Sequence, residues 1–135
     1  MIARCIGNRA DGIPQYLGVL FFELTVQFAL TVGESYPVLG MELYRDSLQL
    51  LVPDNSDHQR PQWMPSELFQ IDISEIPEGW FFRAYPEESS ARRGGFRARW
   101  GYRLLVDSDG HRDGLEEYDP AALAIFSAEL RQATE

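Results

Sequence analysis

The 135-residue sequence contains no lysine, one cysteine and two histidines, and each shortage excludes a class of protein. The single cysteine, Cys5, cannot form an intrachain disulfide framework, and two isolated histidines beside it do not make a zinc site. The phosphate-binding loop that requires lysine is absent, as is the glycine-rich dinucleotide motif. Because the commonest catalytic side chains are so scarce, we expect no cofactor, no metal ion and no enzyme activity.

Long apolar runs are also missing. The most apolar window, residues 17–32, is interrupted by Glu23, Thr25 and Gln27, whereas a membrane span needs about 20 mainly apolar residues. The first residues lack the charged and apolar regions of a secretory signal peptide. Together with one unpaired thiol, these features predict a cytoplasmic protein that does not span a membrane.

The composition predicts a single soluble domain over residues 1–135, since apolar residues make up 44% and charged residues 24%. The net charge of −9 is unevenly distributed. Five of the 12 arginines lie between Arg92 and Arg103, where there is no acid, so 21 acids face 7 arginines elsewhere, a formal −14. Such a surface attracts basic partners and repels nucleic acid and anionic lipid.

Alternating apolar and polar residues predict several strands. A hairpin is expected from residues 36–44 and 48–52, and the other expected strands are residues 2–6, 62–64, 69–73, 79–83 and 96–102. In the last of these, we expect the aromatic side chains to face inward and the arginines outward. Residues 17–30 fit both strand and helix periodicity, and β-branched and aromatic content favours strand.

Helices are predicted mainly near the C-terminus. Asp119 is a typical N-cap followed by Pro120 at the first helical position, and a shorter helix is expected over residues 108–118, capped by Ser108 or Asp109. A single helical turn is expected at residues 65–68. We therefore predict an α+β fold, a strongly bent antiparallel sheet or small barrel closed by one or two C-terminal helices. The expected inward residues are Leu24, Val26, Phe28, Val38, Leu50, Trp63, Leu68, Ile71, Leu123 and Phe126.

The central stretch, about residues 30–83, resembles an SH3-like β-barrel. The resemblance rests on Leu30–Val38 and on Trp63-Met-Pro-Ser-Glu-Leu-Phe69, in which a strand ending in Trp and a proline-started helical turn lead into the last strand. It implies a barrel core over these residues; the helical part at about residues 108–133 is predicted separately, from the caps and the periodicity described above. In size, acidity and layout, the whole chain resembles small bacterial immunity proteins, which implies a toxin as partner.

Motifs that carry chemistry are weak. Cys5 with His58 or His111 would make a Cys–His pair only if the fold joined them, and a buried strand cysteine is the favoured interpretation. Residues 107–114 resemble a calcium loop but lack its bidentate carboxylate, so a capped helix start is favoured. The adjacent pairs Glu87-Glu88 and Glu116-Glu117 are interpreted as solvent-exposed charge.

The preferred functional prediction is a non-enzymatic protein-binding module, an acidic immunity-type protein that neutralises a basic toxin. Its expected partner-binding residues are Tyr44, Asp54, Asp57, Trp80, Glu87, Glu88, Glu116 and Glu117. An alternative is an RNA-associated module that uses Arg92, Arg93, Arg97 and Arg99 within an arginine-glycine segment containing aromatics. A small enzyme relying on carboxylates is a third possibility. The oligomeric state and the identity of the partner stay open.

Overall fold

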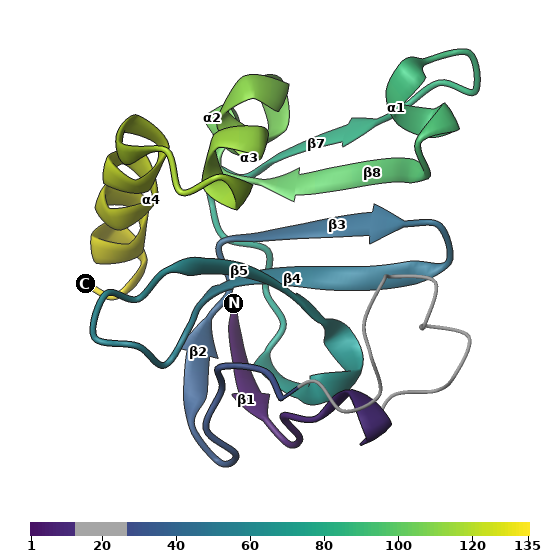
Figure 1. Ribbon diagram of the computed structural model, residues 1–135. Helices are drawn as coiled ribbons and strands as arrows, with labels where there is room; N and C mark the ends of the chain where they lie inside the picture. The colour runs from purple at the N-terminus through teal and green to yellow at the C-terminus, as the bar shows by residue number, and fades with distance from the viewer. Residues whose placement is uncertain (13–26) are drawn as a thin grey trace.

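The computed structural model describes residues 1–12 and 27–135 (Figure 1). Residues 17–26 of the segment predicted as strand or helix, with the expected core residues Leu24 and Val26, lie outside the described residues. Across the described part, antiparallel strands and helices are mixed in one chain. This confirms the α+β class.

The strands form two antiparallel sheets. A three-stranded sheet has the order β2-β1-β6, and a five-stranded sheet has the order β5-β4-β3-β8-β7. Their bounds are β1 Ile2–Cys5, β2 Ser35–Pro37, β3 Gly40–Tyr44, β4 Ser47–Pro53, β5 Pro61–Pro65, β6 Phe69–Ile73, β7 Phe81–Ala84 and β8 Phe96–Gly101. The predicted hairpin is β3 with β4, paired from Gly40↔Leu51 to Tyr44↔Ser47.

A closed barrel is not formed by the described residues, so that part of the fold prediction is wrong. The reason lies after β5. The chain makes the expected helical turn, η3 Ser66–Leu68, and then β6 pairs with β1 instead of returning beside β5. Along the chain, the strand with Trp63, the helical turn after Pro65 and the strand that begins at Phe69 follow one another as predicted. In space, however, β5 and β6 belong to different sheets.

The three main helices follow β8 in the chain and pack against one face of the five-stranded sheet (Figure 1). They are α2 Arg103–Asp107, α3 Asp109–Glu116 and α4 Pro120–Ala133, while η1 Ala10–Gly12 and α1 Ser90–Arg93 are short turns elsewhere. Ser108 caps α3 by accepting from the His111 amide, and Asp119 caps α4 by accepting from Ala122. Both predicted caps are confirmed; α2 was not expected, since residues 103–107 carry no cap or stop signal of their own.

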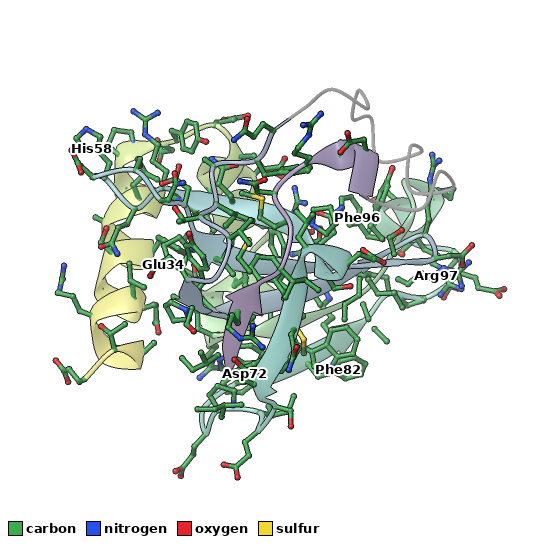
Figure 2. All side chains as sticks on the ribbon, turned by 90° about the horizontal axis from the view of Figure 1, so that it is seen from below. Glu34, His58, Asp72, Phe82, Phe96 and Arg97 are labelled. Atoms are coloured by element: carbon green, nitrogen blue, oxygen red, sulfur yellow. The ribbon has the colours of Figure 1, made fainter. Side chains whose placement is uncertain are left out.

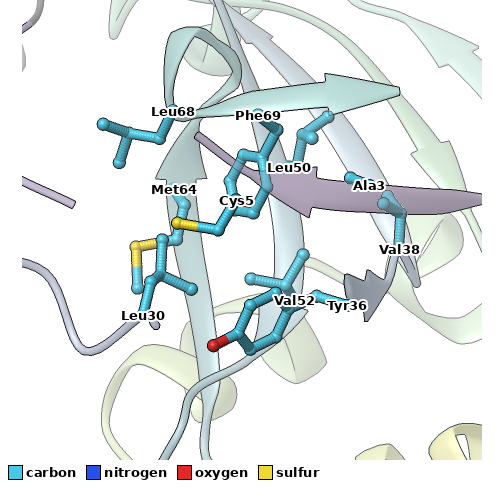
Figure 3. Close-up of a cluster of buried hydrophobic side chains, with 10 residues drawn as sticks. All are labelled: Ala3, Cys5, Leu30, Tyr36, Val38, Leu50, Val52, Met64, Leu68 and Phe69. Atoms are coloured by element: carbon cyan, nitrogen blue, oxygen red, sulfur yellow. The ribbon is translucent and has the colours of Figure 1, made fainter. Parts of the chain in front are cut away.

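The five-stranded sheet is the middle layer of the molecule, with one apolar core on each face. Leu50 lies in the core between the two sheets, whereas its neighbour Leu51 lies in the core under the helices. Figure 3 shows the first core, in which Cys5, Leu50 and Phe69 meet. Burial on both faces explains why residues 50–53 of β4 are an unbroken buried run.

Of the predicted core residues, Val38, Leu50, Leu68 and Phe126 are buried. Phe28 and Trp63 are partly buried against the two cores, and Leu123 is half-buried. The prediction for Ile71 is wrong, because its side chain is 38% exposed. Ile71 shares a face with the buried Phe69, but β6 is an edge strand whose far end lies at the border of the core.

Two glycines let α2 lie directly against this sheet. Gly40 of β3 and Gly101 of β8 are paired, and a Cβ at either position would come 2.3 or 2.7 Å from Cδ2 of Leu105. Gly101 also has a φ of +151°, which side-chain-bearing residues rarely adopt. The pair therefore makes the hollow that Leu105 fills.

Candidate functional site

A buried ion-pair cluster joins the five-stranded sheet to α3. Glu42 of β3 accepts hydrogen bonds at Oε2 from Arg99 Nε (2.8 Å) and Arg112 Nε (3.1 Å), and at Oε1 from Arg112 Nη2 (2.7 Å). The side chains of Glu42, Arg99 and Arg112 are 1%, 3% and 8% exposed. Ion pairs this deep cost desolvation energy, so their geometry must be well satisfied to persist.

Exposed carboxylates of α3 complete the cluster. Arg99 Nη1 donates to the Leu105 carbonyl (3.3 Å) and to Asp109 (3.2 Å), and Arg112 Nη1 lies 2.7 Å from Glu116. Burial acts to lower the pKa of Arg112, but the hydrogen bonds and charge of Glu42, together with Glu116, outweigh it and raise that pKa. Arg112 is therefore a permanent cation held inside the protein.

Two aromatic rings lie against the Arg112 guanidinium, whose carbon is 5.4 Å from the Trp63 ring centre and 4.9 Å from that of Phe96. Phe96 reaches this face because β8 has one extra residue at the register step from Leu43↔Ala98 to Tyr44↔Phe96. Such a bulge turns the side chain before it to the other face of the strand. The predicted arrangement, with every arginine of this strand outward, is therefore wrong at Arg99, which is buried. Phe96 is half-buried, on the same face of the strand as Arg99 and not on that of Trp100.

An open cavity of about 480 Å³ lies over this cluster. Its lining combines charged floor groups with aromatic walls from β3, β5, β8 and the end of α3: Glu42, Arg112, Glu116, Trp63, Phe96, Tyr44 and Tyr118. At the rim, the guanidiniums of Arg45 and Arg60 lie over the rings of Tyr44 and Tyr118, and Gln62 donates to the Tyr118 hydroxyl. The rim is thus braced by the chain's own contacts.

The floor groups are committed to one another. Both Glu42 oxygens accept from guanidiniums, and Arg112 uses Nε, Nη1 and Nη2 on carboxylates. Charged groups fixed in this way shape and polarise a cavity. The arrangement suits recognition of a side chain or small group from outside.

The predicted partner-binding residues divide into groups. Tyr44 and Glu116 line the cavity, and Glu117 is exposed directly after Glu116. Glu87, Glu88 and Asp57 are exposed, and none of the three lines the cavity. Trp80 is half-buried and lines a different cavity. The structure therefore gathers only three of these residues at one place.

Asp54 is not an exposed contact residue. It is 7% exposed, and its Oδ1 accepts from the backbone amides of Ser56 (3.0 Å) and Arg60 (3.1 Å) and from the Ser56 hydroxyl. The side chain therefore organises the loop between β4 and β5. We correct the prediction and leave Asp54 out of the docking surface.

The arginine segment does not form a continuous basic stripe. Arg99 is buried in the ion-pair cluster, and Arg92 Nη1 donates to the Tyr85 carbonyl (3.1 Å). Arg93 and Arg97 are exposed, and Arg97 lies at the periphery of the molecule, 4.0 Å from Asp46 (Figure 2). The prediction of an accessible nucleic-acid contact is therefore wrong for Arg99.

The cysteine and histidines are separated. Cys5 is 1% exposed in the core between the sheets, and burial raises the pKa of its thiol. His111 is a buried residue of α3, its Nε2 is 2.6 Å from the Tyr102 hydroxyl, and burial lowers its pKa. His58 is exposed on a loop. Across residues 1–12 and 27–135, no three His, Cys, Asp or Glu side chains are grouped so that they would hold a metal ion.

Sequence reasoning did not single out Glu42, Trp63 or Arg112 as site residues. A partial signal exists: Glu42 is an isolated charge inside a strand otherwise rich in apolar residues. An isolated charge in such a strand needs a buried partner. The sequence does not show which strands are neighbours, so the partner was not identifiable.

Comparison with known proteins does not assign a family. The chain matches no model of a protein family, no curated protein and no solved structure. In the part of the chain that the structure describes, no helix has the length and apolarity needed to cross a membrane.

Proposed function

We propose that this chain is a non-enzymatic protein-binding module of the immunity type, acting in the cytoplasm on a basic protein partner. The docking surface is the exposed face of α3 together with the aromatic cavity beside it. The observation that carries the proposal is the orientation of α3: its only arginine, Arg112, points inward to Glu42, while its carboxylates stay outside.

The electrostatics of this surface favour a cationic partner. The side chains of Asp109, Asp113 and Glu116 are 59%, 66% and 53% exposed, and Glu117 is exposed next to them. They concentrate part of the chain's net charge of −9 on one face of the helix. Complementary charge of this kind speeds the encounter of two proteins and rejects acidic competitors.

The cavity provides the specific part of the contact. Interfaces draw most of their binding energy from a few side chains, above all aromatic residues and arginine, that insert into desolvated pockets. A volume of about 480 Å³ accommodates one such side chain from the partner. Glu116 at the edge of the cavity gives it a carboxylate next to the aromatic rings of Tyr44 and Phe96.

A function in nucleic-acid binding is less well supported. The segment Arg92–Arg103 supplies three exposed arginines, Arg93, Arg97 and Arg103, of which Arg97 lies near Asp46 and Arg103 near Asp107. Non-specific binding to phosphate chains rests on many neighbouring cations. Three of them on a chain of net charge −9 are a poor basis for it.

The proposal is tested by comparative affinity enrichment from cells of the native host. The wild-type chain is compared with the α3 variant Asp113→Asn/Glu116→Gln/Glu117→Gln and with Glu34→Gln/Glu75→Gln/Glu135→Gln, which removes the same charge elsewhere. We expect one basic protein that the wild type and the second variant retain at low salt and the α3 variant loses. Equal recovery by both variants, or recovery of no basic protein, would contradict the proposal.

A further inference from the structure

A second cavity, of about 520 Å³, lies on another part of the molecule. It is bounded by the start of β1, the end of β2, the linker before β7, the start of α2 and the last turns of α4, and it shares no lining residue with the first cavity. Its size is that of an ordinary small-molecule site. Neither the notable acidity of α3 nor the ion-pair cluster of Glu42 extends to it.

Glu129 gives this cavity a carboxylate without a counter-ion. Within the described residues, Glu129 has no hydrogen bond and no ion pair, although it is partly buried in the cavity wall. Burial raises the pKa of Glu129. The basic side chain of the lining, Arg103, is engaged elsewhere: its Nε lies 3.3 Å from Asp107 and its guanidinium lies over the Phe81 ring.

Aromatic surface completes the lining. Trp80 is half-buried in the wall, and Tyr102 is 5% exposed with its hydroxyl occupied by His111. Burial, and then the charge of Glu129, raise the pKa of Tyr102, so the phenol stays neutral and adds no second negative charge. A carboxylate set among aromatic rings is the combination that proteins use to bind organic cations.

We propose that this second cavity binds an organic cation with a guanidinium group, with Glu129 as its counter-ion and Trp80 and Tyr102 as its aromatic walls. A guanidinium is favoured over an ammonium because it is planar, weakly hydrated and able both to stack on rings and to donate two parallel hydrogen bonds to one carboxylate. The amide of Gln132 and the carboxylate of Glu78 line the same cavity and offer further acceptors. The site is independent of the docking surface on α3.

The test is a titration of the full chain with butylguanidinium, followed by amide chemical shifts in ¹H–¹⁵N NMR spectra. Butylurea is the matched neutral probe, since it has the same shape without the charge. We expect saturable shifts confined to residues 78–80, 102–103 and 129–133 with butylguanidinium and none with butylurea. Shifts of equal size with both probes, or shifts that map to the first cavity, would overturn the proposal.

Two variants test the role of Glu129. Glu129→Gln keeps the shape of the side chain and should weaken binding of butylguanidinium roughly tenfold or more, as expected for loss of a charge-assisted hydrogen bond. Glu87→Gln removes the same charge at an exposed position that lines neither cavity and should leave the dissociation constant unchanged. Equal dissociation constants for the wild type and Glu129→Gln would contradict the assignment, and the comparison of butylguanidinium with butylurea on the wild type stands without any variant.

Discussion

Arg112 donates two hydrogen bonds to the Glu42 carboxylate, from Nε at 3.1 Å and from Nη2 at 2.7 Å, although the two residues are 70 positions apart in the sequence. Two-point contacts of this kind fix both the distance and the orientation of the partners. Since Glu42 lies in β3 and Arg112 in α3, the contact sets how the helix sits on the sheet. It also turns the only cation of α3 inward, which leaves the outer face of that helix acidic.

Glu42→Gln should destabilise the protein strongly. The substitution leaves the guanidiniums of Arg99 and Arg112 buried without their shared carboxylate, and breaking a buried pair in this way costs about 3–5 kcal/mol. The matched control is Glu116→Gln, which removes the 53%-exposed partner of the same Arg112 and should cost less than about 1 kcal/mol. Urea unfolding of the three proteins measures both effects, and equal losses would show that burial does not set the cost.

The glycine pair under α2 predicts a difference between two alanine substitutions. Gly101→Ala brings a Cβ within 2.7 Å of Leu105 at a φ of +151°, and should destabilise by roughly 1–3 kcal/mol. Gly110→Ala lies within α3, where the nearest atom to the new Cβ is 3.7 Å away, and should be neutral or stabilise by up to about 1 kcal/mol. Thermal unfolding of each variant distinguishes the two, and the same loss in both would contradict the packing described for Leu105.

Asp54 provides a test of a structural role against a binding role. Asp54→Ala removes the acceptor of two backbone amides and one hydroxyl, and should cost roughly 1–3 kcal/mol. Asp57→Ala, an exposed position in the same loop, should change the free energy of unfolding by less than about 0.5 kcal/mol. Chemical denaturation measures both variants; an unchanged stability for Asp54→Ala would return that residue to the list of candidate contacts.

His111 predicts a loss of stability in mild acid. Burial lowers its pKa in the folded state below the ordinary value of 6.5, so the unfolded chain takes up the proton more readily. Above pH 6.5 the imidazole is neutral in both states, and its contribution to the free energy of unfolding is complete. Below pH 6.5 that free energy should fall by up to about 1.4 kcal/mol per pH unit. The measurement compares unfolding of the wild type and His111→Asn at pH 7.5 and 5.5. The variant should lose that part of the slope, and identical slopes would contradict the role of His111.

Sequence patterns located most of the elements because they are local. The alternation around Leu50 marked β4, and the side chains of Ser108 and Asp119 marked the starts of α3 and α4, since each cap acts on an amide three residues away. These features need no knowledge of the rest of the chain. The short helix α2 lacks such a signal and exists because Leu105 fits the hollow at Gly40 and Gly101.

The site was harder to predict because it depends on contacts between distant segments. The buried ion-pair cluster forms only when β3 pairs with β8 and α3 folds over both, which brings together Glu42, Arg99 and Arg112. No local sequence pattern predicts that these two strands pair. The bulge near Phe96 is similarly hidden, because strict alternation in the sequence places Phe96 on the wrong face. Tyr44 and Glu116 were predicted as partner-binding residues from their type and position, and the structure places both in the lining of the first cavity, which no sequence pattern reveals.

The central claim is that the partner docks on α3 and the cavity beside it. Hydrogen–deuterium exchange of this chain, free and bound to the basic protein that it retains, locates the contact directly. We expect slower exchange of the bound chain at residues 109–118 and 61–63, with residues 78–80 of the second cavity unchanged. Unchanged exchange at residues 109–118, or protection confined to residues 78–80, would contradict the account.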